Sequence, residues 1–275
     1  MSFFQAILLG IVQGLTEFIP VSSTAHLLIS QRLLGLPASD AMFAFLVLVQ
    51  WGTLLSLFIF YWRDFWNILL ALTAAVRAKR GAPLAVDAQL GLYILLATLP
   101  ALAAGFLLKD AVQALFAAPL LEAGIRLLTA ALILALAEWL SRRTRPLESM
   151  TGLDALLIGL FQVIAVFPGA SRSGVTISGG MLRGFSRTAA ARFAFLMSAP
   201  VMLAAGAYEL LKVVKMPGLM DFLPSLALGF VVAALTGWLA IRWLIGYLNR
   251  HSLWLFAAYC ALLGAACLAA NFWLG

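Results

Sequence analysis

Long apolar segments recur along the whole chain and predict its architecture. Six of them match the roughly 20-residue length of a helix that crosses a bilayer; they lie near 41–61, 88–108, 120–140, 190–211, 222–243 and 253–273. Two further pairs are too short for each member to span alone, at 3–17 with 23–35 and at 153–166 with 171–183. We therefore predict an all-α integral membrane protein.

Each short pair is interrupted by a proline and followed by serines. The interruptions are Phe18-Ile19-Pro20-Val21 and Phe167-Pro168-Gly169-Ala170. Proline removes a backbone donor and disfavours helix in the residue before it, whereas serine is a preferred helix N-cap. A break at membrane depth is tolerated only where protein buries it or where it lines a cavity. We therefore expect two re-entrant helical hairpins, at 3–35 and 153–183.

The order of these elements predicts an inverted-topology repeat. One hairpin and three transmembrane helices occupy 1–140, and a second set occupies 150–275, within a single membrane domain. Because three spans reverse the side of the chain, the second hairpin must enter from the opposite face. The tips of the two hairpins are then expected to meet near the midplane.

The positive charges agree with this count. Twelve lie in connections on the side away from the N-terminus, and four lie on the N-terminal side. We expect the basic side to be cytoplasmic and both termini to face outward. The twelve are Arg63, Arg77, Lys79, Arg80, Arg142, Arg143, Arg145, Arg183, Arg187, Arg192, Arg242 and Arg250, and the four are Arg32, Lys109, Lys212 and Lys215.

Composition supports the same class. Hydrophobic residues make up 64% of the chain and charged residues 11%, against roughly 25% charged in a soluble domain. The net charge of +7 is therefore interpreted as topology and contact with membrane lipids, and no nucleic-acid partner is expected. Residues 1–4 carry no basic leader, so no signal peptide is expected. Cys260 and Cys267 are seven residues apart, too far to bridge on a helix, and are expected to pack in the core.

Polar residues gather at the two interruptions. Gln13 and Glu17 share a helix face, and a helix start offers free N–H groups that suit an anion such as phosphate. Arg172 adds a planar fork that matches phosphate oxygens. Together these residue types suit phosphoryl transfer. The full set is Gln13, Glu17, Ser22, Ser23, Thr24 and His26 at the first interruption, with Gly169, Ser171, Arg172, Ser173 and Thr176 at the second.

Plainer interpretations remain open at this stage. The serines are also good helix caps, and Gln13 is also suited to a hydrogen bond between helices. His26 alone is compatible with a satisfied core histidine. The strongest structural alternative is a Glu17–Arg172 salt bridge, since a charge near the midplane is costly without a partner.

The two segments resemble the motifs of the bacterial undecaprenyl-diphosphate phosphatase family, the bacitracin-resistance membrane proteins. The first family pattern, Glu or Gln, then Glu four residues later, then PVSST and a histidine, is matched from Gln13 to His26. The second, PGxSRSxxT, is matched from Pro168 to Thr176, and the flank Gly179–Pro200 is also similar. Ala194 departs from the serine of many members, and Gln13 takes the less acidic option of its pattern.

This resemblance implies an enzyme that removes the terminal phosphate of undecaprenyl diphosphate. The product, undecaprenyl phosphate, carries precursors of peptidoglycan and other envelope polymers. The resemblance also implies Mg²⁺ or Ca²⁺, a bacterial plasma-membrane location, and a site open to the outer leaflet. Oligomeric state stays open, a homodimer included.

The roles of the site residues follow from residue types and resemblance together. Glu17 is expected to act as base or metal ligand, supported by Gln13. Ser23 is the preferred nucleophile, with His26 as proton shuttle or as the alternative nucleophile. The expected diphosphate-binding residues are Arg172, Ser171, Ser173, Thr176 and Gly169, with Ser22 and Thr24 as supporting hydroxyls.

Two rival functions use the same architecture. Inverted repeats with broken helices are typical of transporters, so a polyprenyl-phosphate flippase is the main alternative. A lipid-binding scaffold without activity is the second. Phosphate release by the purified protein separates the enzyme from both.

Overall fold

The computed structural model describes residues 1–37, 39–78, 82–108, 119–165, 171–213 and 219–274. This part of the chain forms eleven α-helices and one short 3-10 helix, η1 (Leu147–Ser149). The helices are α1 (Phe3–Phe18), α2 (Ser23–Leu33), α3 (Asp40–Phe60), α4 (Trp62–Arg77), α5 (Val86–Leu107), α7 (Pro119–Leu140), α8 (Gly152–Ile164), α9 (Arg172–Leu182), α10 (Arg187–Val213), α11 (Leu219–Leu248) and α12 (Trp254–Leu274).

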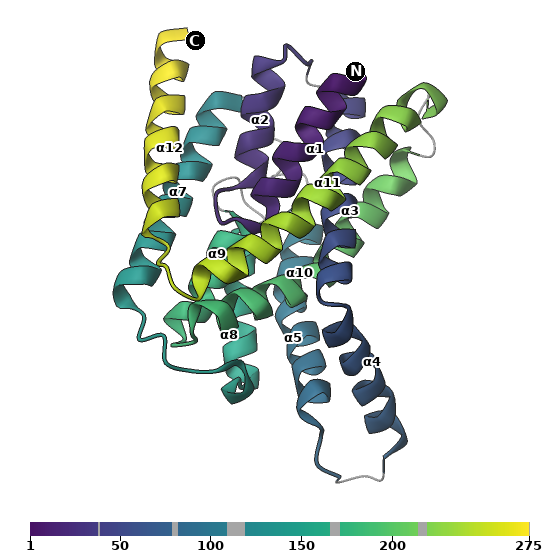
Figure 1. Ribbon diagram of the computed structural model, residues 1–275, viewed down its shortest axis with the longest axis vertical. Helices are drawn as coiled ribbons and strands as arrows, with labels where there is room; N and C mark the ends of the chain where they lie inside the picture. The colour runs from purple at the N-terminus through teal and green to yellow at the C-terminus, as the bar shows by residue number, and fades with distance from the viewer. Residues whose placement is uncertain (38, 79–81, 109–118, 166–170, 214–218, 275) are drawn as a thin grey trace.

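Six of these helices are long and apolar enough to cross a membrane. They include Met42–Phe60, Val86–Leu107, Leu120–Leu140, Arg187–Tyr208, Leu223–Leu248 and Trp254–Trp273. Each overlaps one of the six predicted spans, so the prediction of a multi-pass helical membrane protein is confirmed. Figure 1 shows both termini at one end of the molecule, and the end of α4 with the start of α5 at the opposite end.

The helix α4 departs from the sequence analysis, which treated the stretch after the first span as a connection. Two features explain it. Asp64 lies in the first turn and Arg77 in the last, which favours the helix dipole at both ends. Ile68 and Leu72 pack over Gly91 of α5, so α4 has an apolar stripe and a partner that accepts it closely.

The two short helix pairs repeat the same local design. The first helix of each pair begins with a capping box: Ser2 with Gln5 before α1, and Thr151 with Asp154 before α8. The second helices, α2 and α9, each have 11 residues and begin 149 positions apart, at Ser23 and Arg172. Each is followed by a glycine with positive φ, +62° and +88°. The two pairs therefore share a capping box on the first helix, an equal length of the second helix and a glycine with positive φ after it.

Close backbone contact seats the first helix of each pair. On α1, a Cβ added at Gly14 would lie 1.8 Å from Thr236 Oγ1 of α11. On α8, a Cβ added at Gly159 would lie 2.4 Å from the carbonyl oxygen of Ala97 on α5. Only glycine permits such an approach. The packing of α1 on α11 and of α8 on α5 is thereby fixed, and with it the depth of each interruption.

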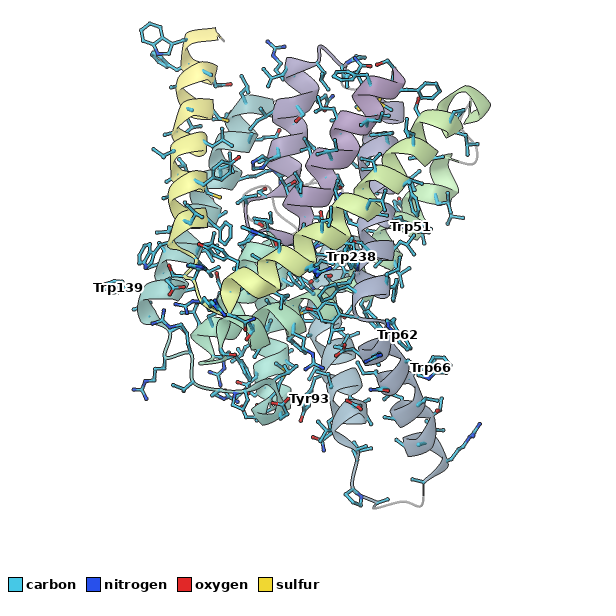
Figure 2. All side chains as sticks on the ribbon, viewed as in Figure 1. Trp51, Trp62, Trp66, Tyr93, Trp139 and Trp238 are labelled. Carbon is cyan, nitrogen blue, oxygen red and sulfur yellow. The ribbon has the colours of Figure 1, made fainter. Side chains whose placement is uncertain are left out.

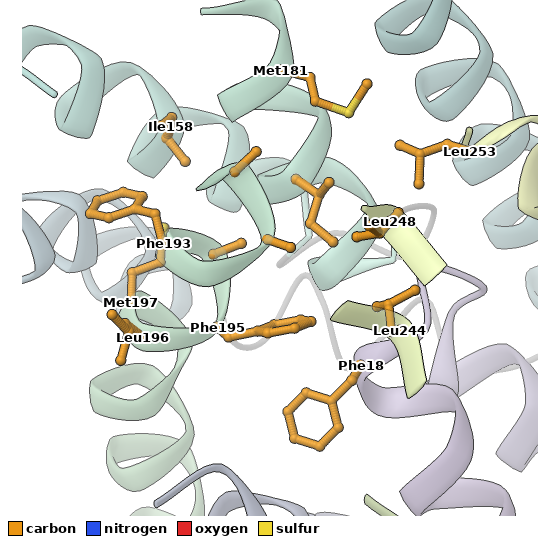
Figure 3. Close-up of a cluster of buried hydrophobic side chains, with 14 of the residues drawn as sticks. Phe18, Ile158, Met181, Phe193, Phe195, Leu196, Met197, Leu244, Leu248 and Leu253 are labelled. Carbon is orange, nitrogen blue, oxygen red and sulfur yellow. The ribbon is translucent and has the colours of Figure 1, made fainter. Parts of the chain in front are cut away.

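A buried apolar cluster joins the two halves behind the interruptions. Phe18, at the end of α1, meets Phe195 of α10 edge to face, with ring centroids 5.3 Å apart. Figure 3 shows these rings beside Leu244 and Leu248 of α11, with Ile158 of α8 across the same cluster. Edge-to-face aromatic pairs are geometrically specific. The last turn of α1 is therefore held in a defined orientation.

Charge pairs tie down the end of the molecule away from the termini. Asp154, only 1% exposed, accepts hydrogen bonds from Arg145 and Arg183 at 2.7 and 2.8 Å. Glu138 of α7 is likewise buried and pairs with Arg187. The Asp154 carboxylate raises the pKa of the Arg145 guanidinium. These pairs anchor the start of α8 and the residue after α9.

The aromatic and cysteine side chains fall into two groups. Trp62, Trp66 and Trp139 are 57%, 55% and 74% exposed and project from the outside of the molecule, as Figure 2 shows. Exposed indoles of this kind suit the bilayer interface. Cys260 and Cys267 are buried and free, which confirms that they pack in the core.

The seat of α8 generates a stability prediction. Gly159→Ala places a methyl group against the backbone of α5, which cannot move away without distorting that helix. We therefore expect the free energy of unfolding to fall by about 1–3 kcal/mol. Gly246→Ala is the matched control, because nothing lies within 4 Å of an added Cβ there. Thermal unfolding in one detergent measures both. An unfolding temperature for Gly159→Ala at or above that of the control would contradict the close packing of α8 on α5.

Candidate active site

Glu17 is the centre of the polar cluster at the interruptions. Gln13 Nε2, one turn earlier on α1, donates to Glu17 Oε2 at 2.8 Å. Ser23 Oγ, at the start of α2, donates to the same oxygen at 2.8 Å. Arg172, the first residue of α9, forms an ion pair with Oε1. Three donors from three helices thus hold one carboxylate, and the ion pair joins the two helix pairs.

The start of α2 is strained at the residue that precedes Ser23. Ser22 has φ of +68°, in the left-handed region that non-glycine residues rarely adopt. Its side chain makes no capping hydrogen bond, although the sequence pattern favoured serine as a cap. Strain of this kind persists only where surrounding contacts impose it, and it is common at active sites.

The start of α9 is capped in the ordinary way. Ser171 Oγ accepts the backbone N–H of Gly174 at 3.2 Å. Ser173 Oγ lies 3.2 Å from Ser171 Oγ and 3.4 Å from the carbonyl oxygen of Ile19, in the first interruption. Thr176 Oγ1 donates to a carbonyl of its own helix at 2.8 Å. Gly169 lies outside the described residues.

His26 faces a different neighbour from the other motif residues. Its Nδ1 lies 2.9 Å from the carbonyl oxygen of Ser22, and its Nε2 lies 2.7 Å from the hydroxyl of Tyr259 on α12. The two rings also stack, with centroids 5.7 Å apart. Both ring nitrogens therefore have partners, and one of them holds the carbonyl of the strained residue that precedes Ser23.

A cavity of about 560 Å³ opens at the cluster. Its polar end contains Glu17, Ser22, Ser23, Thr24, Ser171 and Arg172. The remaining wall is mostly apolar and comes from α3, α5 and α10, with Phe43, Val47, Leu102, Phe106, Val201 and Tyr208 among its residues. Phe106 is 77% exposed and Tyr208 is 54% exposed, so this wall reaches the outer surface of the helix bundle. His26, Ser173 and Thr176 do not line it.

Sequence reasoning missed several polar residues of the cavity. Four polar residues that line the wall were not expected at the site: Gln50, Arg126, Gln162 and Tyr208. One signal was available for Gln162. It precedes Ser171 by the same spacing that separates Gln13 from Ser22.

The residues present fit a divalent cation only with help from a ligand. No group of three His, Cys, Asp or Glu side chains able to hold a metal occurs among the described residues. Gln13 Oε1, however, is buried and has no hydrogen-bond partner, one turn from the Glu17 carboxylate. Mg²⁺ is often bound by one or two protein oxygens with substrate phosphates completing the shell. The donor set matches that pattern.

Fold and cavity together define a class: a multi-pass helical membrane protein with a cavity inside the bundle, lined by an arginine, a carboxylate and hydroxyl groups and by an apolar wall. Comparison with known proteins is more specific. The family model described as bacitracin resistance protein BacA matches residues 6–266. The chain therefore belongs to the bacitracin resistance protein BacA family.

Close relatives span nearly the whole chain. An undecaprenyl-diphosphatase of Anaeromyxobacter dehalogenans is 45% identical over 273 residues, covering 97% of this chain and 90% of the relative. That of Chlorobium phaeovibrioides is 41% identical over 276 residues, covering 96% and 95%. That of Desulforudis audaxviator is 40% identical over 261 residues, covering 95% of both.

The ion pair at the centre of the site generates a second prediction. The Glu17 side chain is 5% exposed and that of Arg172 is 22% exposed. Removing one partner leaves an uncompensated charge, which costs about 3–5 kcal/mol where both partners are fully buried. We therefore expect Glu17→Gln and Arg172→Gln each to lower the unfolding temperature more than the double variant does. Thermal unfolding of all four proteins in one detergent is the measurement. Additive losses in the double variant would show that the two side chains are not coupled.

Proposed function

We propose that this chain is an undecaprenyl-diphosphate phosphatase, which hydrolyses the lipid diphosphate to undecaprenyl phosphate and inorganic phosphate. The observation that carries the proposal is the cavity. Its polar end pairs an arginine and a helix start with a carboxylate-bound serine, which suits phosphoryl transfer. Its apolar wall reaches the lipid-facing surface, which suits an isoprenoid tail. The relatives named for this activity support the same substrate.

In the proposed reaction, Ser23 attacks the terminal phosphorus. Glu17 takes the proton of the Ser23 hydroxyl, to which it is already hydrogen-bonded. The bond from that phosphorus to the bridging oxygen breaks, and undecaprenyl phosphate leaves with the bonding electron pair. Glu17 passes its proton to the departing bridging oxygen and becomes a carboxylate again. Water then attacks the phosphoserine while Glu17 takes a proton from it and returns that proton to the Ser23 oxygen as the bond from Ser23 to phosphorus breaks, and inorganic phosphate departs. Gln13 holds the Glu17 carboxylate in place.

Phosphate is held at the two helix starts. Arg172 contributes its guanidinium, and the start of α9 contributes its free N–H groups. Both stabilise the negative charge that develops on the phosphoryl group. Ser22, Thr24 and Ser171 line the same end of the cavity and serve as hydroxyl partners. Ser173 and Thr176 act through the backbone contacts that shape this end, and we assign them support of the α9 start.

We assign His26 a positioning role. Support comes from its two contacts, which tie the Ser22 carbonyl of α2 to Tyr259 of α12. Ser23, by contrast, lines the cavity and touches the base, which favours it as the nucleophile. A divalent cation, when bound by Glu17 and Gln13 with the substrate phosphates, would neutralise phosphate charge. Mg²⁺ and Ca²⁺ both prefer such oxygen ligands.

The proposal includes the finer topology. Residues 1–140 and 150–275 form inverted repeats, each a re-entrant hairpin with three spans. Matched caps and helix lengths support this, and so does the packing: α1 lies on α11 as α8 lies on α5, while α3 packs against α10 and α7 against α12. The excess of arginine at the end away from the termini supports outward termini and a site open to the outer leaflet of the bacterial plasma membrane.

The flippase alternative is less well supported. Transport requires no nucleophile, whereas the site holds a serine hydroxyl against a carboxylate. The names of the relatives describe phosphatases. We also propose membrane lipids and a second copy of the chain as partners.

The nucleophile can be identified by trapping. Purified protein given undecaprenyl diphosphate labelled at the terminal phosphate, then quenched in acid and base separately, should carry acid-stable, base-labile label on Ser23. Ser23→Ala should lower phosphate release by about 10³-fold or more, as loss of a nucleophile does in comparable enzymes. Acid-labile label on His26 would overturn the assignment.

The cation can be tested by removal. If Gln13 and Glu17 hold a divalent ion with the substrate, a chelator should abolish phosphate release, and excess Mg²⁺ or Ca²⁺ should restore it. Gln13→Glu adds a charged oxygen ligand, so we expect it to lower the cation concentration needed for half-maximal rate. Full phosphate release in the presence of chelator would show that the reaction needs no divalent cation.

A further inference from the structure

The amide of Gln162 is a polar group of the cavity wall that the proposed reaction does not use. This side chain is 1% exposed and lines the cavity wall from α8. Neither its nitrogen nor its oxygen has a hydrogen-bond partner. Buried polar groups in folded proteins are almost always hydrogen-bonded, so an orphaned amide at a cavity wall is typical of a ligand contact.

Comparison with Gln13 explains why the amide is left without a partner. Both glutamines stand nine residues before the serine at the N-cap of the following helix, Ser22 or Ser171. Gln13 donates to Glu17, one turn further along. Four positions after Gln162 the sequence has Val166, which carries no polar side chain. The second repeat therefore presents the same amide without the internal acceptor.

Arg126 reaches the same cavity from α7. This helix packs against both α2 and α9, which carry Ser23 and Arg172. The cavity wall thus includes two guanidinium groups but only one carboxylate, Glu17, and that carboxylate pairs with Arg172. Glu122, one turn away on α7, interacts electrostatically with Arg126 but does not line the cavity. The wall therefore carries a second guanidinium besides Arg172, together with the unpartnered amide of Gln162.

We propose that Arg126 and Gln162 form a second anion subsite, which binds the phosphate that stays on the lipid. This inference rests on the proposed function, because a diphosphate presents two phosphates and Arg172 with the helix starts accounts for one. When the bond to the bridging oxygen breaks, that oxygen keeps the electron pair and becomes a terminal oxygen of the lipid monophosphate. Arg126 and the Gln162 Nε2 group donate to this second phosphate, which fixes the diphosphate across the cavity.

The test is a binding measurement that needs no turnover. Purified Ser23→Ala protein, which cannot be phosphorylated on that residue, is titrated separately with farnesyl diphosphate, farnesyl monophosphate and inorganic phosphate, and the rise in unfolding temperature gives each apparent affinity. Gln162→Leu is added to this background to remove the amide with little change in volume. Gln31→Leu is the matched control, since Gln31 is buried on α2, bonds to the Pro37 carbonyl and does not line the cavity.

The expected pattern separates the two phosphates. Gln162→Leu should weaken binding of both farnesyl compounds about tenfold and leave inorganic phosphate binding unchanged, while Gln31→Leu changes none of them. The Glu122→Gln/Arg126→Gln double variant, compared with the Ser23→Ala protein, should show the same pattern, because it removes one negative and one positive charge and leaves the net charge unchanged. Weaker inorganic phosphate binding with unchanged farnesyl monophosphate would mean that the subsite takes the released phosphate, and it would overturn the proposal. Unchanged binding of all three ligands would do so as well.

Failure of the proposed function has a different signature. If the protein with Ser23 intact releases no phosphate from undecaprenyl diphosphate, yet the farnesyl titrations follow the expected pattern, the subsite stands and the hydrolysis does not. If the protein hydrolyses undecaprenyl diphosphate but the substitutions change no ligand affinity, the proposed function stands and the second subsite does not.

Discussion

A carboxylate and a guanidinium that must be buried together constrain the whole structure. Glu17 lies in the last turn of α1 and Arg172 begins α9, and neither charge is stable alone at low dielectric. Their pairing requires the two helix interruptions to meet. The same meeting places Ser23, Ser171 and two helix starts around one cavity. A broken helix and a buried charge are each unfavourable in a membrane. Here each supplies the polar partner that the other needs.

The rest of the fold keeps this meeting point in place. Glycines let α1 and α8 press directly on the backbones of α11 and α5, which sets how deep each interruption lies. Phe18 and Phe195 fix the last turn of α1 from behind, and the Asp154 pairs hold the far ends of α8 and α9. His26 links the strained start of α2 to α12. Stability and site geometry are thus supplied by the same contacts.

Much of this fold could be predicted from the sequence, because a bilayer restricts which residues and backbone conformations can lie within it. Hydropathy located all six spans, and prolines with serines placed the ends of the short helices within two residues of the observed ones, as with 23–35 against Ser23–Leu33. The grouping of Gln13, Glu17, Ser23 and Arg172 followed from their cost at membrane depth. What the sequence did not reveal depended on tertiary contact. The helix α4 is stabilised by its partner α5, and His26 turns to Tyr259, 233 residues away. Arg126 and Gln162 reach the cavity only through helix packing.

Disulfide trapping tests most directly whether the two interruptions meet. A Cβ added at Gly174 would lie 3.8 Å from the Cβ of Pro20, close to the mean separation in disulfides. In protein whose Cys260 and Cys267 are replaced by alanine, the pair Pro20→Cys and Gly174→Cys should cross-link within one chain under mild oxidation in native membranes. Free thiols at both positions in the folded protein would contradict the account.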